Sequence, residues 1–379
     1  MKFQPFLFSI FFVHLFYNLE RFFFLNELFS ITGLLYLLFN FNVLINLPFR
    51  PIIFCILAFI LYLSVLFVLS LIDLNTTYYN LLRTMPFYYS IFSFFTGIYF
   101  GKYLIKAVSI NSFKHFKFTS LIFSFLSHGR LASVTFIPIF LLNYNTRFLG
   151  YFILLILFYF AHGGATSIFF ILFFLAFYLI YRIHYLRLIT FSRFSFFFYV
   201  CFSLCGLYIL YPQLDFSTHL YYQDSFFDVN SMWRLMYWSI LVFNTINDYF
   251  LFGIGFGTPL FDISSPEYNF VVQANPDDDH LPYVHGPHNS FMYIFARSGI
   301  FGFILCSLIP FLLFRFYFLN KLFLSNYSYA VALAFLFICV ASLFNVILES
   351  PLYASVYWIF AGIFYHSIYC HKSLRNESK

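Results

Sequence analysis

The sequence predicts an all-α integral membrane protein that crosses the bilayer many times, and three observations support this. Of the 379 residues, 62% are hydrophobic and 9% are charged, whereas a soluble domain carries about 25% charged residues. The apolar residues form long runs that suit helices of about 20 residues, the length that crosses the hydrocarbon core. The basic residues gather at alternate ends of these runs, as they do in oriented membrane proteins. A water-soluble enzyme, a disordered chain, a collagen-like fibre and a disulfide scaffold are therefore excluded.

Breaks in the apolar pattern divide the chain into about twelve spans. Backbone groups in lipid must be hydrogen-bonded within their own segment, which favours helices. The runs do not alternate between apolar and polar residues as barrel strands do. The three runs between residues 113 and 162 are short, so ten or eleven spans also fit the sequence. We expect spans at roughly 3–18, 22–45, 51–72, 86–105, 113–127, 131–145, 147–162, 165–181, 194–212, 289–314, 328–348 and 352–370.

The distribution of Lys and Arg predicts the orientation of these spans. With both termini in the cytoplasm, 15 of the 20 Lys and Arg residues lie at cytoplasmic span ends. This excess is typical of cytoplasmic loops. The outer side keeps five basic residues, which are Arg21, Arg83, Arg130, Arg234 and Arg297.

One segment, residues 213–288, departs from the span pattern inside what we otherwise interpret as a single membrane domain over residues 1–379. It holds nine of the chain's 14 acidic residues, and Arg234 is its one basic residue. Loops in compact proteins usually have about 4–6 residues, so a connection of this length is typical of a functional loop. The topology places it outside the cytoplasmic membrane, between spans 9 and 10. Within it, residues 233–252 are semi-apolar and predict an amphipathic helix at the membrane interface.

Three features on the predicted outer side could carry chemistry. The first is Arg234 beside Trp233 and Trp238, which could equally anchor a helix at the interface. The second is the glycine-rich turn 253–259, which could be only a turn. The third is the segment 285–290, which ends at the predicted start of a span.

In that third segment, Pro287 and Asn289 suit a helix start. The free N–H groups and the positive end of the helix dipole favour an anion there. A histidine beside them, His288 or else His285, could act as a general base near neutral pH. The alternative is that the histidine only caps the helix.

Taken together, these motifs resemble the bacterial O-antigen ligase-like family. The resemblance rests on Arg234 with Trp238, on Gly253-Ile254-Gly255-Phe256-Gly257, and on His288-Asn289 followed by Gly299 and Gly302. The segment 343–351 also resembles the penultimate outer turn of that family, and Met292 fits a position four residues after the histidine. The resemblance covers about residues 120–370.

The sequence departs from the family at one site. The family usually shows a Ser-Arg pair at the outer start of a span, whereas residues 162–166 here read His-Gly-Gly-Ala-Thr. Gly163 and Gly164 still offer backbone N–H groups to a diphosphate. Arg130, at the outer start of another span, could replace the missing guanidinium.

The resemblance implies a glycosyltransferase of the cytoplasmic (inner) membrane, with its active site facing the extracytoplasmic side. Such an enzyme moves a glycan from a polyprenyl diphosphate, such as undecaprenyl diphosphate, to a sugar hydroxyl of an acceptor. The acceptor is the lipid A-core in an O-antigen ligase of lipopolysaccharide biosynthesis, or a lipid-linked glycan in an O-antigen or exopolysaccharide polymerase. For this reaction we expect catalytic roles for His288 and Arg234, diphosphate binding by Arg130, Arg234, Gly163 and Gly164, and secondary roles for His285 and Asn289.

We expect no cofactor, no metal and no nucleic-acid partner. Asp277, Asp278, Asp279 and His280 could hold a divalent ion, but a solvated acidic loop explains them more simply. A transporter or flippase for lipid-linked glycan is the alternative function, and it would place charges and broken helices inside spans. A non-catalytic scaffold would not need Arg and His on one side of the membrane.

Overall fold

A computed structural model describes residues 25–47, 50–72, 78–109, 229–260, 288–320, 326–343 and 347–377. Every regular element in these ranges is helical, which agrees with the predicted all-α class. The elements are α2 (Leu25–Ile45), α3 (Arg50–Ile72), α4 (Tyr78–Tyr89), the 3₁₀-helix η2 (Ser90–Phe92), α5 (Ser93–Ser109), α12 (Val229–Asp248), α14 (Ser290–Asn320), α15 (Asn326–Ala341) and α16 (Pro351–Glu377).

Three of the described helices are long and apolar enough to cross a membrane, at Asn26–Ile45, Arg50–Ile72 and Ser290–Leu319. Their outer faces carry large apolar side chains, such as Phe39, which is 84% exposed, and Ile72, which is 71% exposed. A soluble monomer rarely leaves a broad apolar surface open to water. These faces are therefore suited to contact lipid.

The observed helices coincide with several of the residue ranges predicted to be helical and differ from others. α2, α3 and α16 begin within three residues of the predicted starts at 22, 51 and 352. The span expected at 86–105 is instead helical from Tyr78, with a 3₁₀ turn between α4 and α5. The expected spans 3–18, 113–127, 131–145, 147–162, 165–181 and 194–212 lie outside the described residues.

Two predicted boundaries were wrong. The span expected at 328–348 ends at Ala341, because the carbonyl of Ser342 turns away and accepts a hydrogen bond from the N–H of Ser290 at 2.8 Å. The span expected at 289–314 continues to Asn320 and is broken at Gly299. The interfacial helix expected at 233–252 is α12, which ends at Asp248.

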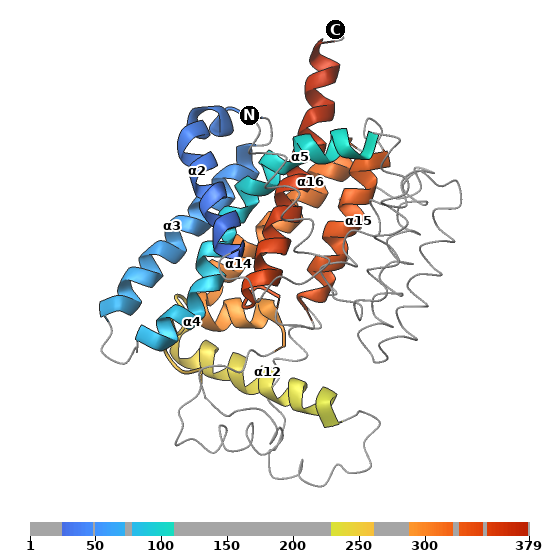
Figure 1. Ribbon diagram of the computed structural model, residues 1–379. Coiled ribbons are helices and arrows are strands. Elements are labelled where there is room, and N and C mark those ends of the chain that lie inside the picture. Colours follow the sequence, from blue (N-terminus) through green and yellow to red (C-terminus); the bar gives the residue numbers. More distant parts are fainter. Residues whose placement is uncertain are drawn as a thin grey trace.

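The described helices form a bundle in which α16 is central (Figure 1). α16 packs on α5 at very short range, because Gly97 and Gly362 face each other with no side chain between the backbones. A Cβ on Gly97 would collide with the backbone of Ile359, and one on Gly362 with the carbonyl of Phe94. Small residues at such crossings are typical of membrane helices, since they allow close van der Waals contact.

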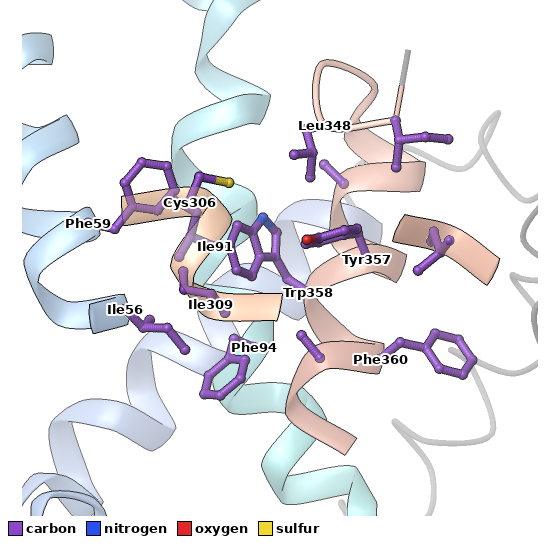
Figure 2. Packing of buried hydrophobic residues seen from close by; sticks show 14 of the residues in the cluster. Ile56, Phe59, Ile91, Phe94, Cys306, Ile309, Leu348, Tyr357, Trp358 and Phe360 are labelled. Carbon is purple, nitrogen blue, oxygen red and sulfur yellow. The ribbon is translucent and has the colours of Figure 1, made fainter. Parts of the chain in front are cut away.

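The core of the bundle is filled around Trp358 of α16, which is fully buried. Its ring lies 6.4 Å from that of Phe59 in α3 and 5.1 Å from that of Tyr357. Figure 2 shows Cys306 and Ile309 of α14 beside Trp358, so that α3, α14 and α16 share one apolar centre. This core fixes the position of α14 relative to α16.

α12 lies across one end of the bundle, next to the first turns of α14 (Figure 1). Its contact face includes Tyr237, Trp238 and Leu241, all of them buried. The sequence predicts that this end of the bundle faces outward. The fold therefore brings the helix of the long loop, which carries Arg234, against the helix that follows His288.

Candidate functional site

The start of α14 is a capped helix end that follows His288. The side-chain oxygen of Asn289 accepts hydrogen bonds from the N–H groups of Phe291 and Met292, both at 3.1 Å. This satisfies two N–H groups that would otherwise lack a partner in the first turn. His288 has φ 49°, a left-handed conformation in which His is enriched among non-glycine residues. The half-buried His288 thus occupies a sharp turn directly before the helix.

Ser290 links this helix start to the segment before α16. Its hydroxyl donates a hydrogen bond to the carboxylate oxygen Oε2 of Glu349 at 2.7 Å. The same hydroxyl oxygen accepts hydrogen bonds from the N–H groups of Ile347 and Leu348, each at 3.0 Å. Because the side chain is fully buried, these contacts hold the turn 347–350 firmly against the residue that follows His288-Asn289.

Gly299 breaks α14 and makes room for the glycine-rich turn. Its φ of 61° and ψ of −166° lie in a region that essentially only glycine adopts. Gly253 is also left-handed, with φ 75°. A Cβ on Gly253 would collide with the backbone of Arg297, and a Cβ on Gly299 with that of Leu251. The two glycines therefore allow the turn and the helix to meet backbone to backbone.

The turn supplies the hydrogen bonds that the helix loses at this break. The N–H groups of Ile254 and Gly255 donate to the carbonyls of Ala296 at 2.7 Å and Arg297 at 3.0 Å. The carbonyl of Ser298 accepts a hydrogen bond from the hydroxyl of Tyr62 in α3 at 2.6 Å. The N–H of Ile300 donates to Phe250 at 2.8 Å. The glycine-rich turn therefore packs directly against α14 and is hydrogen-bonded to it.

Arg297 is the cation at the centre of this arrangement, and it is 1% exposed. Its Nη1 donates to the carbonyl of Gly255 at 3.2 Å and to that of Thr258. Its guanidinium carbon lies 5.3 Å from the centre of the Tyr293 ring, within cation–π range. The Nε of Arg297, Oγ1 of Thr258 and Oε1 of Glu349 are buried and have no hydrogen-bond partner within the described part of the chain.

Burial and this cation together set the ionisation of the neighbouring groups. Burial raises the pKa of Glu349 to about 7, although the Ser290 hydroxyl, backbone N–H groups and the charge of Arg297 act in the opposite direction. Burial also raises the pKa of Tyr237 in α12, again against the effect of Arg297. Tyr237 therefore keeps its proton, whereas Glu349 titrates near neutral pH.

Arg234 lies on α12 one turn before Tyr237 and Trp238, and its side chain is half-buried. Tyr237 lies close enough to Arg297 and Glu349 for their charges to act on it. Arg234, Asn289 and His288 thus belong to neighbouring elements at one end of the bundle. The other expected site residues, Arg130, Gly163, Gly164 and His285, lie outside the described residues, as do Asp277, Asp278, Asp279 and His280.

Sequence reasoning missed Ser290, Arg297 and Glu349. A signal existed for Arg297, because it is the one charged residue between 289 and 314. Charged residues inside spans are usually functional, but the predicted topology treats Arg297 as one of the basic residues on the outer side. Glu349 lies in the segment 343–351 of the predicted outer turn, and its pairing with Ser290 has no local signature.

These features define a helical membrane protein with a polar cluster at one end of its bundle. The sequence model of a family described as O-antigen ligase matches residues 116–307, just over half of the chain. The chain therefore belongs to the O-antigen ligase family. A comparison with curated proteins found no match.

Family membership assigns the chain to polysaccharide assembly, as a glycosyltransferase-like membrane enzyme that uses lipid-linked glycan substrates. The matched range includes α12, the glycine-rich turn and the first half of α14.

Proposed function

We propose that this protein transfers a glycan from a polyprenyl diphosphate to a sugar hydroxyl on the extracytoplasmic side of the inner membrane. The observation that carries the proposal is the position of His288, at the capped start of α14 and beside the helix that bears Arg234. The donor is a lipid-linked oligosaccharide, and the acceptor is either lipid A-core or another lipid-linked glycan.

In the proposed reaction, the acceptor oxygen bonds to the anomeric carbon as the bond from that carbon to the diphosphate oxygen breaks. The electron pair of the broken bond leaves with the lipid diphosphate. The imidazole of His288 takes the proton of the acceptor hydroxyl, as a general base near neutral pH can. His285 is the second candidate for this role.

The leaving diphosphate needs cations and N–H donors, because negative charge develops on its oxygens. Arg234 and Arg130 are the proposed cations, since a guanidinium pairs with two phosphate oxygens at once. The N–H groups in the first turn of α14 are already bonded to Asn289 and Ser342, so α14 contributes only the positive end of its dipole. The backbone N–H groups of Gly163 and Gly164 are the proposed neutral donors. Asn289 supports this site by capping α14.

The test uses purified protein in nanodiscs with a polyprenyl-diphosphate-linked repeat unit and either acceptor, and the products are resolved as a gel ladder. Replacement of His288 should abolish transfer at an unchanged protein level. His288→Asn is the sharper variant, because Asn also tolerates the left-handed conformation but is not a base. His371→Ala, at the predicted cytoplasmic end, is the control.

Wild-type turnover by His288→Asn would overturn the assignment. If His285→Ala were inactive at the same time, the role would move to His285. A product of one added glycan on lipid A-core indicates a ligase, and a ladder of lengthening lipid-linked glycan indicates a polymerase.

A second candidate, a flippase for lipid-linked glycan, is favoured by the break of α14 beside the buried Arg297. Transporters often bind their substrates at discontinuous helices. Here, however, the carbonyls of Ala296, Arg297 and Ser298 accept hydrogen bonds from the protein's own groups. We therefore favour glycan transfer. Movement of labelled donor across proteoliposomes without any acceptor would support the flippase instead.

A further inference from the structure

The contact between Ser290 and Glu349 joins two segments that lie far apart in the sequence, and it does so next to His288. Ser290 makes one hydrogen bond as a donor to Glu349 and two as an acceptor from Ile347 and Leu348. Its own N–H donates to the carbonyl of Ser342 at 2.8 Å. Any shift of the turn 347–350 is therefore transmitted to the residues immediately before Ser290.

We propose that Glu349 is a positioning residue for glycan transfer: as a carboxylate it holds Ser290, and thereby fixes the helix end on which His288 lies. The proposal rests on the proposed role of His288. Glu349 does not itself need to touch the substrate.

The ionised form of Glu349 suits this role better than the protonated form. A hydroxyl that donates to a carboxylate makes a shorter and stronger hydrogen bond than one that donates to a neutral acceptor. In the described part of the chain, the charged and titratable groups that act on this carboxyl or its neighbours are Arg297 and Tyr293 of α14 and Tyr237 of α12. Arg297 is the cation that favours the carboxylate.

The buried atom Oε1 of Glu349 indicates that this carboxyl is not placed for stability alone. Among the described residues this atom has no hydrogen-bond partner, and burial of a charge without full pairing is costly. Because burial raises the pKa of Glu349 to about 7, ionisation opposes folding between the unfolded pKa of 4.5 and that value. The protein therefore keeps a carboxyl where a neutral group would be more stable.

The first experiment compares the pH dependence of transfer in wild type and Glu349→Gln. The glutamine still accepts the Ser290 hydroxyl bond but carries no charge. We expect kcat to fall about tenfold with an unchanged KM for the donor, because small misplacements of a reacting group reduce rates by up to about a hundredfold. In the pH profile of kcat, the fall on the acid side should become less steep by one proton, because Glu349 no longer ionises. The part of that fall that comes from protonation of His288 should persist.

Glu27→Gln is the matched control. Glu27 of α2 also accepts a hydroxyl hydrogen bond, from Tyr89 at 2.6 Å, but this bond joins α2 to α4 and not to the start of α14. This variant should keep the wild-type rate and pH profile. A Glu349→Gln profile of wild-type shape would overturn the proposal, whereas absence of transfer by the wild type would refute the proposed function instead.

The second experiment measures the melting temperature of wild type and Glu349→Gln in detergent at pH 5 and pH 8. Because burial raises the pKa of Glu349 to about 7, the wild type should lose stability as the pH rises from about 4.5 to about 7, so the variant should gain stability relative to wild type between pH 5 and pH 8. A difference in melting temperature that is the same at both pH values would contradict this cost of ionisation, and with it the argument that the carboxyl is kept for a purpose other than stability.

A double-mutant cycle tests whether Glu349 acts through Ser290. Ser290→Ala should also lower kcat, and adding Glu349→Gln to it should change the rate less than twofold, because coupled residues are non-additive. Effects of the two changes that multiply would show that Glu349 acts independently of Ser290, and the proposal would fail.

Discussion

Arg297 shows how a single charge is accommodated in an apolar bundle. A buried guanidinium is costly unless its donors are paired, and here the carbonyls of Gly255 and Thr258 and the ring of Tyr293 surround it. The hydrogen bonds of its Nη1 therefore go to the segment 249–260, which contains the glycine-rich turn. This leaves Arg234 and Arg130 as the candidates for the diphosphate.

Arg130→Lys and Arg234→Lys should each reduce transfer by about tenfold or more, although both variants keep the positive charge. Lysine is a point charge and cannot bind two phosphate oxygens in a planar fork. The measurement is kcat/KM for the lipid-linked donor in nanodiscs. Arg50→Lys, at the exposed start of α3, is the control and should retain the wild-type value. The diphosphate assignment fails for any arginine whose lysine variant matches this control.

At the scale of elements, the break in α14 divides it into a short N-terminal part next to the candidate site and a long C-terminal part in the core. The C-terminal part includes Cys306 and Ile309, which pack around Trp358 (Figure 2). The N-terminal part is held by the glycine-rich turn and by Tyr62. The break therefore lets the first part of α14 pack on the glycine-rich turn while the rest of the helix packs in the core.

Gly299→Ala should lower the melting temperature and the transfer rate together. The backbone strain alone is roughly 1–3 kcal/mol, and the added Cβ would also collide with the backbone of Leu251. Differential scanning fluorimetry in detergent measures the stability. Ile304→Ala, at a 45% exposed position of the same helix, is the control and should change it much less. An unaffected melting temperature in Gly299→Ala would show that the turn is not packed against α14 as described.

At the scale of the whole molecule, α14 and α16 begin at the end of the bundle where α12 lies and run to the opposite end (Figure 1). The positive-inside pattern of the sequence predicts that the first of these ends lies outside the cytoplasm.

A cysteine at position 278 should be labelled by an impermeant maleimide in intact spheroplasts. The background is a variant without the six native cysteines. A cysteine at Arg315, exposed near the other end of α14, should be labelled only after the membrane is disrupted. The reverse pattern would place the whole proposed site in the cytoplasm and reject it.

Transfer should survive EDTA, because guanidinium groups and helix N-termini can stabilise the diphosphate without a divalent ion. The assay is the purified reaction with and without chelator, and untreated enzyme is the control. A loss of activity that magnesium or manganese restores would make Asp277, Asp278 and Asp279 candidate ligands.

The membrane class, the helix boundaries of α2 and α3, and the cap of α14 could be predicted because each depends on local sequence. Hydrophobic run length predicts a span, and Asn289 predicts a helix start within its own neighbourhood. Arg234 and His288 were also chosen from sequence, by resemblance and by their expected side of the membrane.

Which residues of distant segments contact each other at the site was decided by the tertiary structure alone. The hydroxyl of Ser290 meets Glu349 across 59 positions of sequence, and the N–H of Gly255 meets the carbonyl of Arg297 across 42 positions. Periodicity and propensity describe one element at a time, so they carry no information on which elements become neighbours. The break at Gly299 depends on such neighbours, because the segment 249–260 and Tyr62 of α3 supply the hydrogen bonds that the helix loses there.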